Sequence, residues 1–430
     1  NDMIDKTKNK KAPGPDNITN LIIKNTKNAI SDFLLKLFNA FSNYEYFPTI
    51  YKKAKIIMIY KDGKPKNDPL SYRPLSLTSS IGKIYEKIVA KRVYKWAEEN
   101  EKFSIQQNGF RANRSVNDNV FKIIECIKRG YTKKQLTGAV FLDVEKAFDQ
   151  VWHQGLIFKL AHIGMPKKTL SWIISYLEER SMKISIEKHN SEALKPIHGV
   201  PQGSPLSPLL FILYVSDVPK LNNGVFLSQF ADDLAIWTSS RNIDTISNRL
   251  NGALHTLSNW CNKWKIKLNP TKTKPILFKF KKKLCKEDQE FKIKMNNQVI
   301  SNVNEVKFLG VDFDDKLKFD KFITNKINHL QGIRREIFKL KYKNAVSLKI
   351  LVILYKVFIR SKLEYGLPAL IMINKEYHAK LESFQHYILT HFLDYPRGIN
   401  RINTNSQCDI SDLKTRINHL TKKWYIKTKN

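Results

Sequence analysis

The sequence contains few cysteines, and their positions narrow the class of protein. Four occur among 430 residues, at Cys126, Cys261, Cys285 and Cys408. None lies in a CxxC pair or beside histidines at the spacing of zinc ligands, so we expect neither a disulfide framework nor a zinc site. This cysteine usage indicates a reducing, intracellular compartment.

Long apolar runs are also absent, which argues against a membrane span. The best candidate, residues 206–215, is about half as long as a spanning helix needs to be, and it contains Pro208. No signal peptide precedes the chain, which begins at Asn1 rather than at methionine. We therefore expect a piece of a longer polypeptide with no membrane partner.

Acidic residues are outnumbered by basic ones, and this imbalance is the strongest bulk signal. Lys and Arg number 74 against 39 Asp and Glu, which gives a formal net charge of +35. Such a surplus favours association with polyanions, because binding releases their condensed counterions. The alternative is a soluble protein from a lysine-rich, AT-biased genome. An apolar content of 42% supports a folded interior in either case.

Hydrophobic periodicity predicts a mixture of helices and strands. Buried strands are expected where apolar, β-branched runs are short, and helices where apolar residues recur every three or four positions. The tail from about residue 320 is basic and helical in pattern, as in a separate helical subdomain. The predicted helices are 30–43, 85–100, 146–160, 206–215 and 240–265, the predicted strands are 55–60, 137–144 and 306–313, and 226–237 is a predicted hairpin.

Acidic residues occur at two places where folding alone does not explain them. Asp143 follows the buried-strand pattern of 139–142, and Asp232 and Asp233 lie inside an apolar stretch. Adjacent carboxylates repel each other and are costly to desolvate, so an unpaired buried cluster would take up protons. Mg²⁺ removes both problems, because it prefers oxygen ligands and neutralises the charge.

Two such ions would support nucleotidyl transfer. One lowers the pKa of a primer 3′-hydroxyl, and the other stabilises the departing pyrophosphate. The alternative for an isolated Asp-Asp pair is a solvated turn. The apolar residues that flank Asp232 and Asp233, together with a second acid after a matching strand, favour the metal site.

A loop rich in glycine and proline, residues 199–208, lies between these two places in the sequence. Glycine and proline at this density fix a loop that a ligand can approach closely. The loop leads directly into an apolar helix, so it has a rigid support. Its alternative interpretation is a tight connection before a buried helix.

Several short segments follow one another in a recognisable order. They are 11–16 (KAPGPD), 68–77 (DPLSYRPLSL), 107–111 (QNGFR), 141–149 (FLDVEKAFD), 199–208 (GVPQGSPLSP), 230–233 (FADD), 268–273 (LNPTKT) and 308–310 (FLG). Together they resemble the reverse transcriptases of non-LTR retrotransposons, and most closely the jockey-like group. The resemblance extends from about residue 10 to about residue 370.

The resemblance implies roles in the chemistry. Asp143, Asp232 and Asp233 match the acids that bind two Mg²⁺ ions, with Mn²⁺ as a substitute, and the backbone carbonyl after Asp143 assists them. Lys272 matches a candidate general acid for pyrophosphate, although a solvated surface lysine is an equal alternative. Asp149 is left out of the site, because six residues along a helical pattern it should face elsewhere, in a cap or a pair.

The resemblance also implies contacts to nucleotide and nucleic acid. Phe148 matches the aromatic residue that excludes a ribose 2′-hydroxyl, with core packing as the alternative. Arg73 matches a residue that pairs with the triphosphate, and Lys61 or Lys64 shares that work. Gln202 and Gly203 match the loop that supports the incoming nucleotide and template. The expected nucleic-acid contacts are Arg111, whose alternative is a structural carboxylate partner, and Phe308 and Gly310 of the primer grip.

The fold that the resemblance implies is α+β, a right-hand polymerase. It comprises fingers, a palm with antiparallel sheet and helices, and a helical thumb. The expected division is an N-terminal extension leading into the fingers (1–54), fingers and palm (55–315), and a helical thumb with a basic C-terminal region (316–430).

The implied function is RNA-directed DNA polymerisation by target-primed reverse transcription. The expected partners are an RNA template, a DNA primer, dNTPs and the element's own RNA in a ribonucleoprotein of nucleus and cytoplasm. An upstream endonuclease is expected in the longer polypeptide. The alternatives are a non-catalytic RNA-binding module and another polymerase of the same hand, such as an intron maturase. The intact acids disfavour the first, and segments 11–16 and 68–77 disfavour the second.

Overall fold

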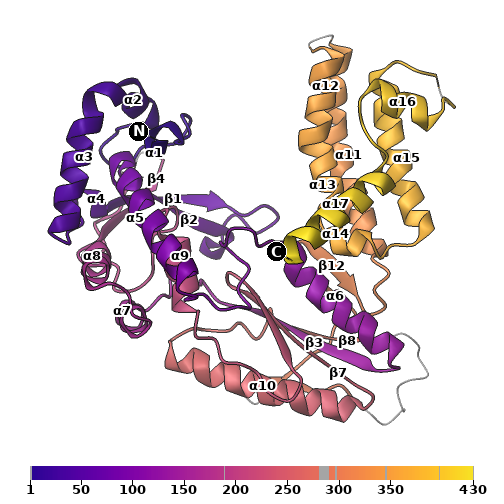
Figure 1. Ribbon diagram of the computed structural model, residues 1–430, viewed down its shortest axis with the longest axis horizontal. Coiled ribbons are helices and arrows are strands. Elements are labelled where there is room, and N and C mark those ends of the chain that lie inside the picture. The colour runs from indigo at the N-terminus through magenta and orange to yellow at the C-terminus, as the bar shows by residue number, and fades with distance from the viewer. Residues whose placement is uncertain are drawn as a thin grey trace. The chain divides into compact units, whose positions relative to one another are not determined.

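A computed structural model describes residues 2–187, 189–279, 290–295, 298–343, 346–396 and 398–429. Cys285 lies outside these residues, and the other three cysteines are free thiols. The chain divides into two compact units (Figure 1). Unit 1 comprises Asn1–Phe110, Asp143–Lys220 and His255–Asn269, and unit 2 comprises Arg111–Leu142, Leu221–Leu254 and Pro270–Asn430.

Unit 1 contains a sheet in the order β2-β1-β4-β5, with helices around it. Strand β1 runs antiparallel to β2 and parallel to β4. The strands are β1 (Lys53–Tyr60), β2 (Tyr72–Leu77), β4 (Ser181–Ile186) and β5 (His189–Asn190), and a 3₁₀ turn spans Pro69–Ser71. The helices are α1 (Asp2–Asp5), α2 (Asn20–Asn25), α3 (Lys27–Asn43), α4 (Thr49–Lys52), α5 (Ser80–Glu99), α7 (His153–His162), α8 (Lys167–Leu177) and α9 (Ser207–Tyr214).

Buried aromatic rings join the helices of unit 1. The Tyr85 ring on α5 lies edge-on to Trp172 on α8, with centroids 5.3 Å apart, and the Trp172 indole N–H donates to the Tyr85 hydroxyl at 2.7 Å. Phe47 packs against both rings. Because aromatic side chains bury a large apolar area and Trp172 and Tyr85 also satisfy each other's polar groups, these helices form a firm base for the loops they carry.

Unit 2 is built around a second sheet, in the order β6-β7-β3-β8. Strands β6 and β7 form an antiparallel hairpin, and β3 is antiparallel to β8. The strands are β3 (Leu136–Asp143), β6 (Phe226–Phe230), β7 (Asp233–Ser240) and β8 (Lys274–Phe278), with further short hairpins β9 (Ile293–Met295) and β10 (Gln298–Ile300), and β11 (Glu305–Phe308) and β12 (Val311–Asp314). Helix α6 (Val116–Thr132) belongs to unit 2, and α10 (Ile243–Lys263) contributes residues to both units.

Strand β3 is buried on both faces of this sheet. Its residues Ala139 and Phe141 belong to a core cluster that includes the buried face of α6. Gly138 points the other way, where a Cβ atom would lie 2.4 Å from Ile246 of α10. Because side chains alternate along a strand, glycine at position 138 allows α10 to pack closely while its neighbours fill the α6 side.

The C-terminal part of unit 2 is helical. Its α-helices are α11 (Asp320–Tyr342), α12 (Leu348–Leu354), α13 (Ser361–Leu363), α14 (Leu367–Leu370), α15 (Lys375–Phe392), α16 (Arg401–Gln407) and α17 (Leu413–Lys429), with a π-helical segment over Tyr355–Arg360. Helix α17 returns to α6, where the Trp424 indole donates to Asp118 at 2.9 Å and packs on Phe121. In the described parts of the chain, no helix has the length and apolarity needed to span a membrane.

Most of the predicted elements are confirmed, as is the α+β class. The predicted helices 30–43, 85–100, 206–215 and 240–265 correspond to α3, α5, α9 and α10, and the 226–237 hairpin to β6 and β7. Two predictions were wrong in part, since α7 (His153–His162) covers only the second half of the predicted helix 146–160. Residues 145–150 form turns before α7 begins at His153, and 306–313 is two short strands around a turn instead of one strand.

Candidate active site

The predicted catalytic acids lie at the ends of two neighbouring strands. Asp143 is the last residue of β3, and Asp233 is the first residue of β7, which is next to β3 in the sheet. Asp232 precedes it in the β6–β7 turn. All three side chains are half-buried. Each carboxylate therefore lies where a buried strand meets the surface.

The β6–β7 turn holds its acid pair in a strained backbone conformation. Phe230 pairs with Asp233, so Ala231 and Asp232 are the two central residues of a tight hairpin turn. Ala231 has φ of 54°, in the left-handed region that residues with a Cβ atom rarely adopt. Such strain is tolerated where the surrounding structure fixes the turn, and it often marks a functional site.

After Asp143 the chain pairs for a short distance with residues 267–269, and both segments lie in unit 1. The Asn269 N–H donates to the Asp143 carbonyl and the Glu145 N–H to the Lys267 carbonyl, each at 2.9 Å. These two bonds enclose an isolated antiparallel pair of Val144 with Leu268. In this pattern the N–H and C=O of Val144 itself point away from Leu268. The carbonyl that the sequence analysis expected to assist the acids is therefore directed away from the 267–269 strand.

The donor chemistry of these three acids suits a hard divalent cation, which prefers carboxylate and carbonyl oxygens. Among the described residues, no three His, Cys, Asp or Glu side chains form a group that could hold a metal ion in this structure. The oxygen ligands are thus of the right chemical kind.

The glycine loop, which we define as residues 199–208, contacts β2 and the 146–151 turn, and all three segments lie in unit 1. Gly199 has φ of 87°, and a Cβ atom there would lie 2.7 Å from the Asp149 carbonyl oxygen. Gly203 has φ of 114°, and its Cβ would lie 3.0 Å from the Ser76 carbonyl oxygen. The Ser76 N–H donates to the Gln202 carbonyl at 2.7 Å. Glycine is required at both positions by conformation and by space.

A buried polar chain anchors the end of this loop to α5 and α8. The Tyr176 hydroxyl donates to the Ser204 hydroxyl at 2.8 Å, and the Ser204 hydroxyl in turn donates to Glu86. Burial raises the pKa of the Glu86 carboxyl, while the nearby Arg180 charge opposes that rise. All these groups are buried, so breaking any of these hydrogen bonds would leave a buried polar group without a partner. The bonds therefore hold the end of the loop in place.

The 146–151 turn was predicted to be helical, and its departure from a helix has a local cause. Lys146 has φ of 42°, and the Asp149 N–H donates to the Lys146 carbonyl at 2.8 Å. The turn is then fixed by the glycine loop, because Gly199 N–H donates to the Val151 carbonyl and Val200 N–H to the Phe148 carbonyl, both at 2.8 Å. Contacts between distant segments therefore override the local helical pattern.

This turn presents Phe148 as a half-buried ring. Its centroid lies 5.1 Å from that of Phe211 on α9 and 6.2 Å from that of Phe110. The ring is supported on one side by packing and retains an exposed part. Both interpretations of Phe148, core packing and sugar selection, are compatible with this placement.

The predicted triphosphate contacts lie on the β1–β2 hairpin. Arg73 is exposed on β2, where its backbone pairs with Ile59 of β1. The Lys61 ammonium donates to the Leu70 carbonyl at 2.9 Å, whereas Lys64 is exposed in the connecting loop. Lys61 thus has a structural contact within the loop, which makes Lys64 the better candidate for a ligand.

Two further predicted residues have exposed or half-exposed positions. Lys272 is exposed just before β8, and Arg111 is half-buried before α6. The segment that carries Lys272 continues into the strand that pairs with β3, since Phe141 lies opposite Lys274. Lys272 therefore lies two residues before β8, whose first residue pairs near the end of β3.

The predicted primer grip is a tight hairpin. Phe308 pairs with Val311 across the turn residues Leu309 and Gly310, whose φ angles are 48° and 76°. The Tyr365 hydroxyl donates to the Leu309 carbonyl at 2.5 Å. Phe308 is buried, with its centroid 4.8 Å from that of Phe141. Its side chain is therefore part of the core, and any nucleic-acid contact falls to the turn.

Two further side chains outside the predicted site touch the glycine loop. The Gln202 amide nitrogen donates to the Asp149 carboxylate at 2.8 Å, and the His153 Nε2 lies 2.7 Å from the Gly199 carbonyl oxygen. Burial lowers the pKa of His153. From the sequence we expected Asp149 to cap or pair, and His153 was not among the predicted site residues. Asp149 and His153 follow Phe148 closely in the sequence, and this was the only sign that they could belong to the site. That they contact the glycine loop is seen only in the fold.

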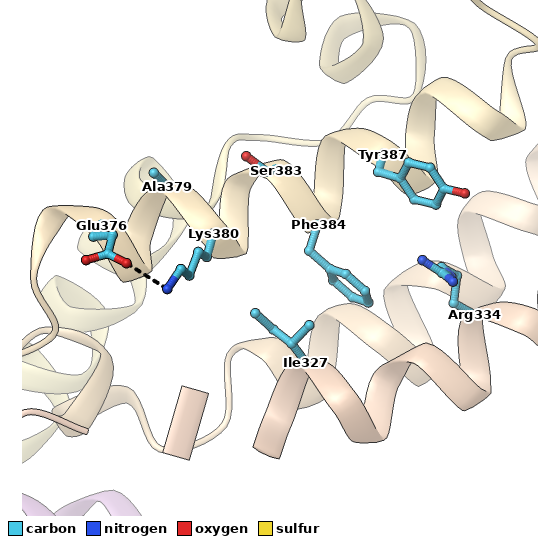
Figure 2. A pocket seen from close by; sticks show the side chains of 8 residues that line it. All are labelled: Ile327, Arg334, Glu376, Ala379, Lys380, Ser383, Phe384 and Tyr387. Carbon is cyan, nitrogen blue, oxygen red and sulfur yellow. Dashed lines mark ion pairs between the residues drawn. The ribbon is translucent and has the colours of Figure 1, made fainter. Parts of the chain in front are cut away.

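Two of the hollows in the described residues can be compared with the predicted site. One, of about 530 Å³, lies in unit 1 and is lined by residues of β1, β2, β4 and the glycine loop, including Asp149 and Gln202. The other, of about 610 Å³, is an open groove between α11 and α15 (Figure 2). The described residues that line this groove, among them the ion pair of Glu376 with Lys380, include none of the predicted site residues. The first hollow is the one associated with the site.

Comparisons with known proteins decide the family. The family model described as "Reverse transcriptase (RNA-dependent DNA polymerase)" matches residues 64–313. The chain belongs to the reverse transcriptase family. This match spans the glycine loop and all three strand-end acids. The prediction of a jockey-like reverse transcriptase is thereby confirmed at the level of the family.

Curated relatives support the same family. The chain is 31% identical over 395 residues to the RNA-directed DNA polymerase from mobile element jockey of Drosophila melanogaster, covering 89% of this chain and 42% of the relative. It is 33% identical over 317 residues to the probable RNA-directed DNA polymerase from transposon BS of the same species, covering 72% of this chain and 34% of the relative. The reverse transcriptase chain therefore spans less than half the length of either relative.

Among solved structures, the telomerase from Candida tropicalis in complex with a fragment of telomeric RNA is similar in part. It aligns with a TM-score of 0.46 and 12% identity, covering 91% of this chain and 68% of that chain. The assignment to the reverse transcriptase family rests on the sequence match.

The strained turn of this reverse transcriptase yields a prediction. We expect Ala231→Val to lower the melting temperature, because a β-branched side chain adds crowding to a left-handed conformation that already costs a residue with a Cβ atom roughly 1–2 kcal/mol. Ala231→Gly is the matched control and should melt at or above the parent temperature, since glycine adopts this φ without a steric penalty. A valine variant that melts at the parent temperature would contradict the assignment of strain to this turn.

Proposed function

We propose that the chain is an RNA-directed DNA polymerase that extends a DNA 3′ end on an RNA template. Support comes from its membership of the reverse transcriptase family and from the acids at the ends of neighbouring strands β3 and β7. The placement of these acids carries the proposal. A protein that only bound RNA would gain nothing from carboxylates beside a phosphate backbone, because like charges repel.

The catalytic centre in this proposal consists of Asp143, Asp232 and Asp233. Reverse transcriptases depend on a divalent metal cation, and we take the ions here to be two Mg²⁺, with Mn²⁺ as a substitute. Bound between these carboxylates, the ions would lower the pKa of the primer 3′-hydroxyl and neutralise charge on the leaving pyrophosphate. The Val144 carbonyl, directed away from Leu268, is the fourth oxygen donor that the chain offers.

Other side chains would bind and orient the nucleotide. Arg73 is exposed on β2 and suits the triphosphate, because its planar guanidinium matches phosphate geometry. Lys64 would add charge from the loop beside it. The half-buried ring of Phe148 would meet the sugar, and Gln202 with Gly203 would support the base pair from the fixed loop. Lys272 would donate a proton to pyrophosphate.

The partners follow from the same assignment. We propose an RNA template and a DNA primer held by the basic surface, with Arg111 and the Leu309–Gly310 turn among the contacts. The wider role is target-primed insertion of the element's own RNA, as a ribonucleoprotein of nucleus and cytoplasm and with an endonuclease elsewhere in the longer polypeptide. In this proposal residues 1–54 lead into the fingers, 55–315 form fingers and palm, and 316–430 form the thumb and basic C-terminal region.

The central acid is tested by primer extension with Asp232→Asn. With RNA template, annealed DNA primer, dNTPs and Mg²⁺, we expect the variant to lose activity by at least about 100-fold, because a neutral amide cannot offset cation charge. Binding of the primer–template should change little, since the basic surface is intact. Omission of the divalent cation should abolish extension by the parent.

The matched control is Asp244→Asn, which alters an exposed acid of unit 2 outside every predicted motif. It should extend the primer at the parent rate. Equal extension by the parent and the Asp232→Asn variant would refute the metal site. A parent that binds primer–template yet never extends it would favour the RNA-binding module instead.

Sugar selection is tested by Phe148→Val. If the exposed part of the Phe148 ring blocks a ribose 2′-hydroxyl, the smaller side chain should reduce the preference for dNTP over rNTP by at least about tenfold. The measurement compares kcat/KM for both nucleotides on the same template. Phe158→Val, at an exposed ring of α7, is the control. Unchanged sugar preference in the Phe148 variant would leave the ring with a packing role alone.

A further inference from the structure

Asp149 lies against the glycine loop, and its carboxylate contacts a single side chain of that loop. The Gln202 amide nitrogen donates to the Asp149 Oδ1 at 2.8 Å. Both residues line the 530 Å³ hollow of unit 1, together with apolar side chains of β1 and β4 such as Ile56 and Ile184. The hydrogen bond therefore lies at the edge of an open space and beside the proposed nucleotide site.

The backbone of the loop does not need this carboxylate to keep its place. Main-chain hydrogen bonds join Gly199 to Val151 and Val200 to Phe148, and the Ser76 N–H donates to the Gln202 carbonyl. The His198 ring contacts the main-chain oxygen of Asp149, at 2.8 Å. Because these bonds use backbone atoms of the turn and of β2, substitution of the Asp149 side chain leaves them intact. What the carboxylate adds is the orientation of the Gln202 side chain.

An ionised carboxylate selects one end of the glutamine amide. It can only accept hydrogen bonds, so it faces the Gln202 Nε2 and repels Oε1. The amide oxygen must then point away from Asp149. Burial raises the pKa of the Asp149 carboxyl, while the Gln202 hydrogen bond and the charges of Lys146 and His198 oppose that rise. Charge-assisted hydrogen bonds of this kind are stronger than neutral ones.

We propose that Asp149 is a positioning residue for nucleotide selection, which acts by holding the Gln202 amide in one orientation. The inference rests on the proposed polymerase function and assigns to it a residue outside the metal-binding acids. With the amide fixed, Gln202 presents the same acceptor oxygen to the base pair in every turnover. Without Asp149, the amide can flip, which exchanges its oxygen and nitrogen, or it can move away from the base pair. The site then distinguishes correct from incorrect nucleotides less well.

The variants Asp149→Asn and Asp149→Ala test this role. Asparagine keeps the shape but can face either end of the Gln202 amide, whereas alanine removes the partner. We expect the KM for the correct dNTP to rise by about tenfold in Asp149→Ala, as loss of one charge-assisted hydrogen bond implies, and by less in Asp149→Asn. The kcat at saturating dNTP should stay within about threefold of the parent, because the metal-binding acids are unchanged.

A double-mutant cycle separates positioning from a general effect on the fold. In a Gln202→Ala background, Asp149→Ala should cause no further rise in KM and no further loss of discrimination against mismatched dNTP. Glu192→Gln, at an exposed acid of the same unit, is the control and should match the parent. Equal, independent losses in both backgrounds, or a lower melting temperature that accounts for the loss, would overturn the proposal.

A readout without turnover distinguishes this inference from the polymerase function itself. In the protein labelled with ¹⁵N at glutamine side chains, the Gln202 amide signal is identified by its absence from Gln202→Ala. It should show one strongly shifted proton in the parent, and this shift should vanish in Asp149→Ala. A Gln202 signal that is the same in the parent and in Asp149→Ala would overturn the proposal. Absence of extension by the parent and by Glu192→Gln would instead refute the polymerase function, with the amide signal still deciding the contact.

Discussion

The burial of strand β3 on both faces is the constraint on which the rest of the site depends. Helix α6 fills one face through Ala139 and Phe141, and α10 approaches the other so closely that position 138 must be glycine. A strand enclosed in this way can carry a charged side chain only where it leaves the core, and Asp143 is that residue. The packing of β3 thus determines where its carboxylate can lie, and it restricts motion of the backbone that carries Asp143.

The position of Asp232 and Asp233 depends on the hairpin turn between β6 and β7. The pair at the β6–β7 turn is held by a two-residue hairpin whose first central residue, Ala231, has a positive φ. A hairpin fixes the register of both strands, so the acids cannot slide along the sheet. Strain in the turn is the cost of presenting adjacent carboxylates at a strand end, and the buried residues of β7 stabilise it.

The glycine loop is held in one conformation by its backbone contacts and by buried hydrogen bonds. Loops without side-chain bulk are flexible in isolation, yet Gly199 and Gly203 allow backbone contacts with the 146–151 turn and with β2 that no larger residue could make. The buried hydrogen bonds through Ser204 add a second attachment. As a result, Phe148, Gln202 and the strand that carries Arg73 share one rigid framework in unit 1.

Much of this could be predicted from the sequence, because the signals were local. The enclosed strand, the hairpin around Asp232 and Asp233, and the apolar helix after the glycine loop all follow from periodicity and composition. The 146–151 turn could not, since the positive φ of Lys146 and the loop contacts arise from tertiary structure. Nor could the turn at Leu309–Gly310, where the strand pattern on each side conceals a two-residue reversal.

Residues whose role depends on a distant partner were the hardest to predict. Asp149 was set aside because its spacing from Asp143 suggested another helix face, and only the fold brings Gln202 to it. Strand β4 carried no prediction although Met182, Ile184 and Ile186 alternate with polar residues, and only the fold shows that it pairs in parallel with β1. Long-range pairing supplies the partner in both cases, and single-sequence patterns contain no record of it.

The most direct test of this account is diffraction from the protein crystallised with primer–template, an incoming nucleotide and Mn²⁺, with anomalous data collected for manganese. We expect anomalous density against the carboxylates of Asp143 and of the Asp232–Asp233 pair, beside the nucleotide triphosphate. Manganese density bound to other residues, with the nucleotide present and these carboxylates turned away from it, would contradict it.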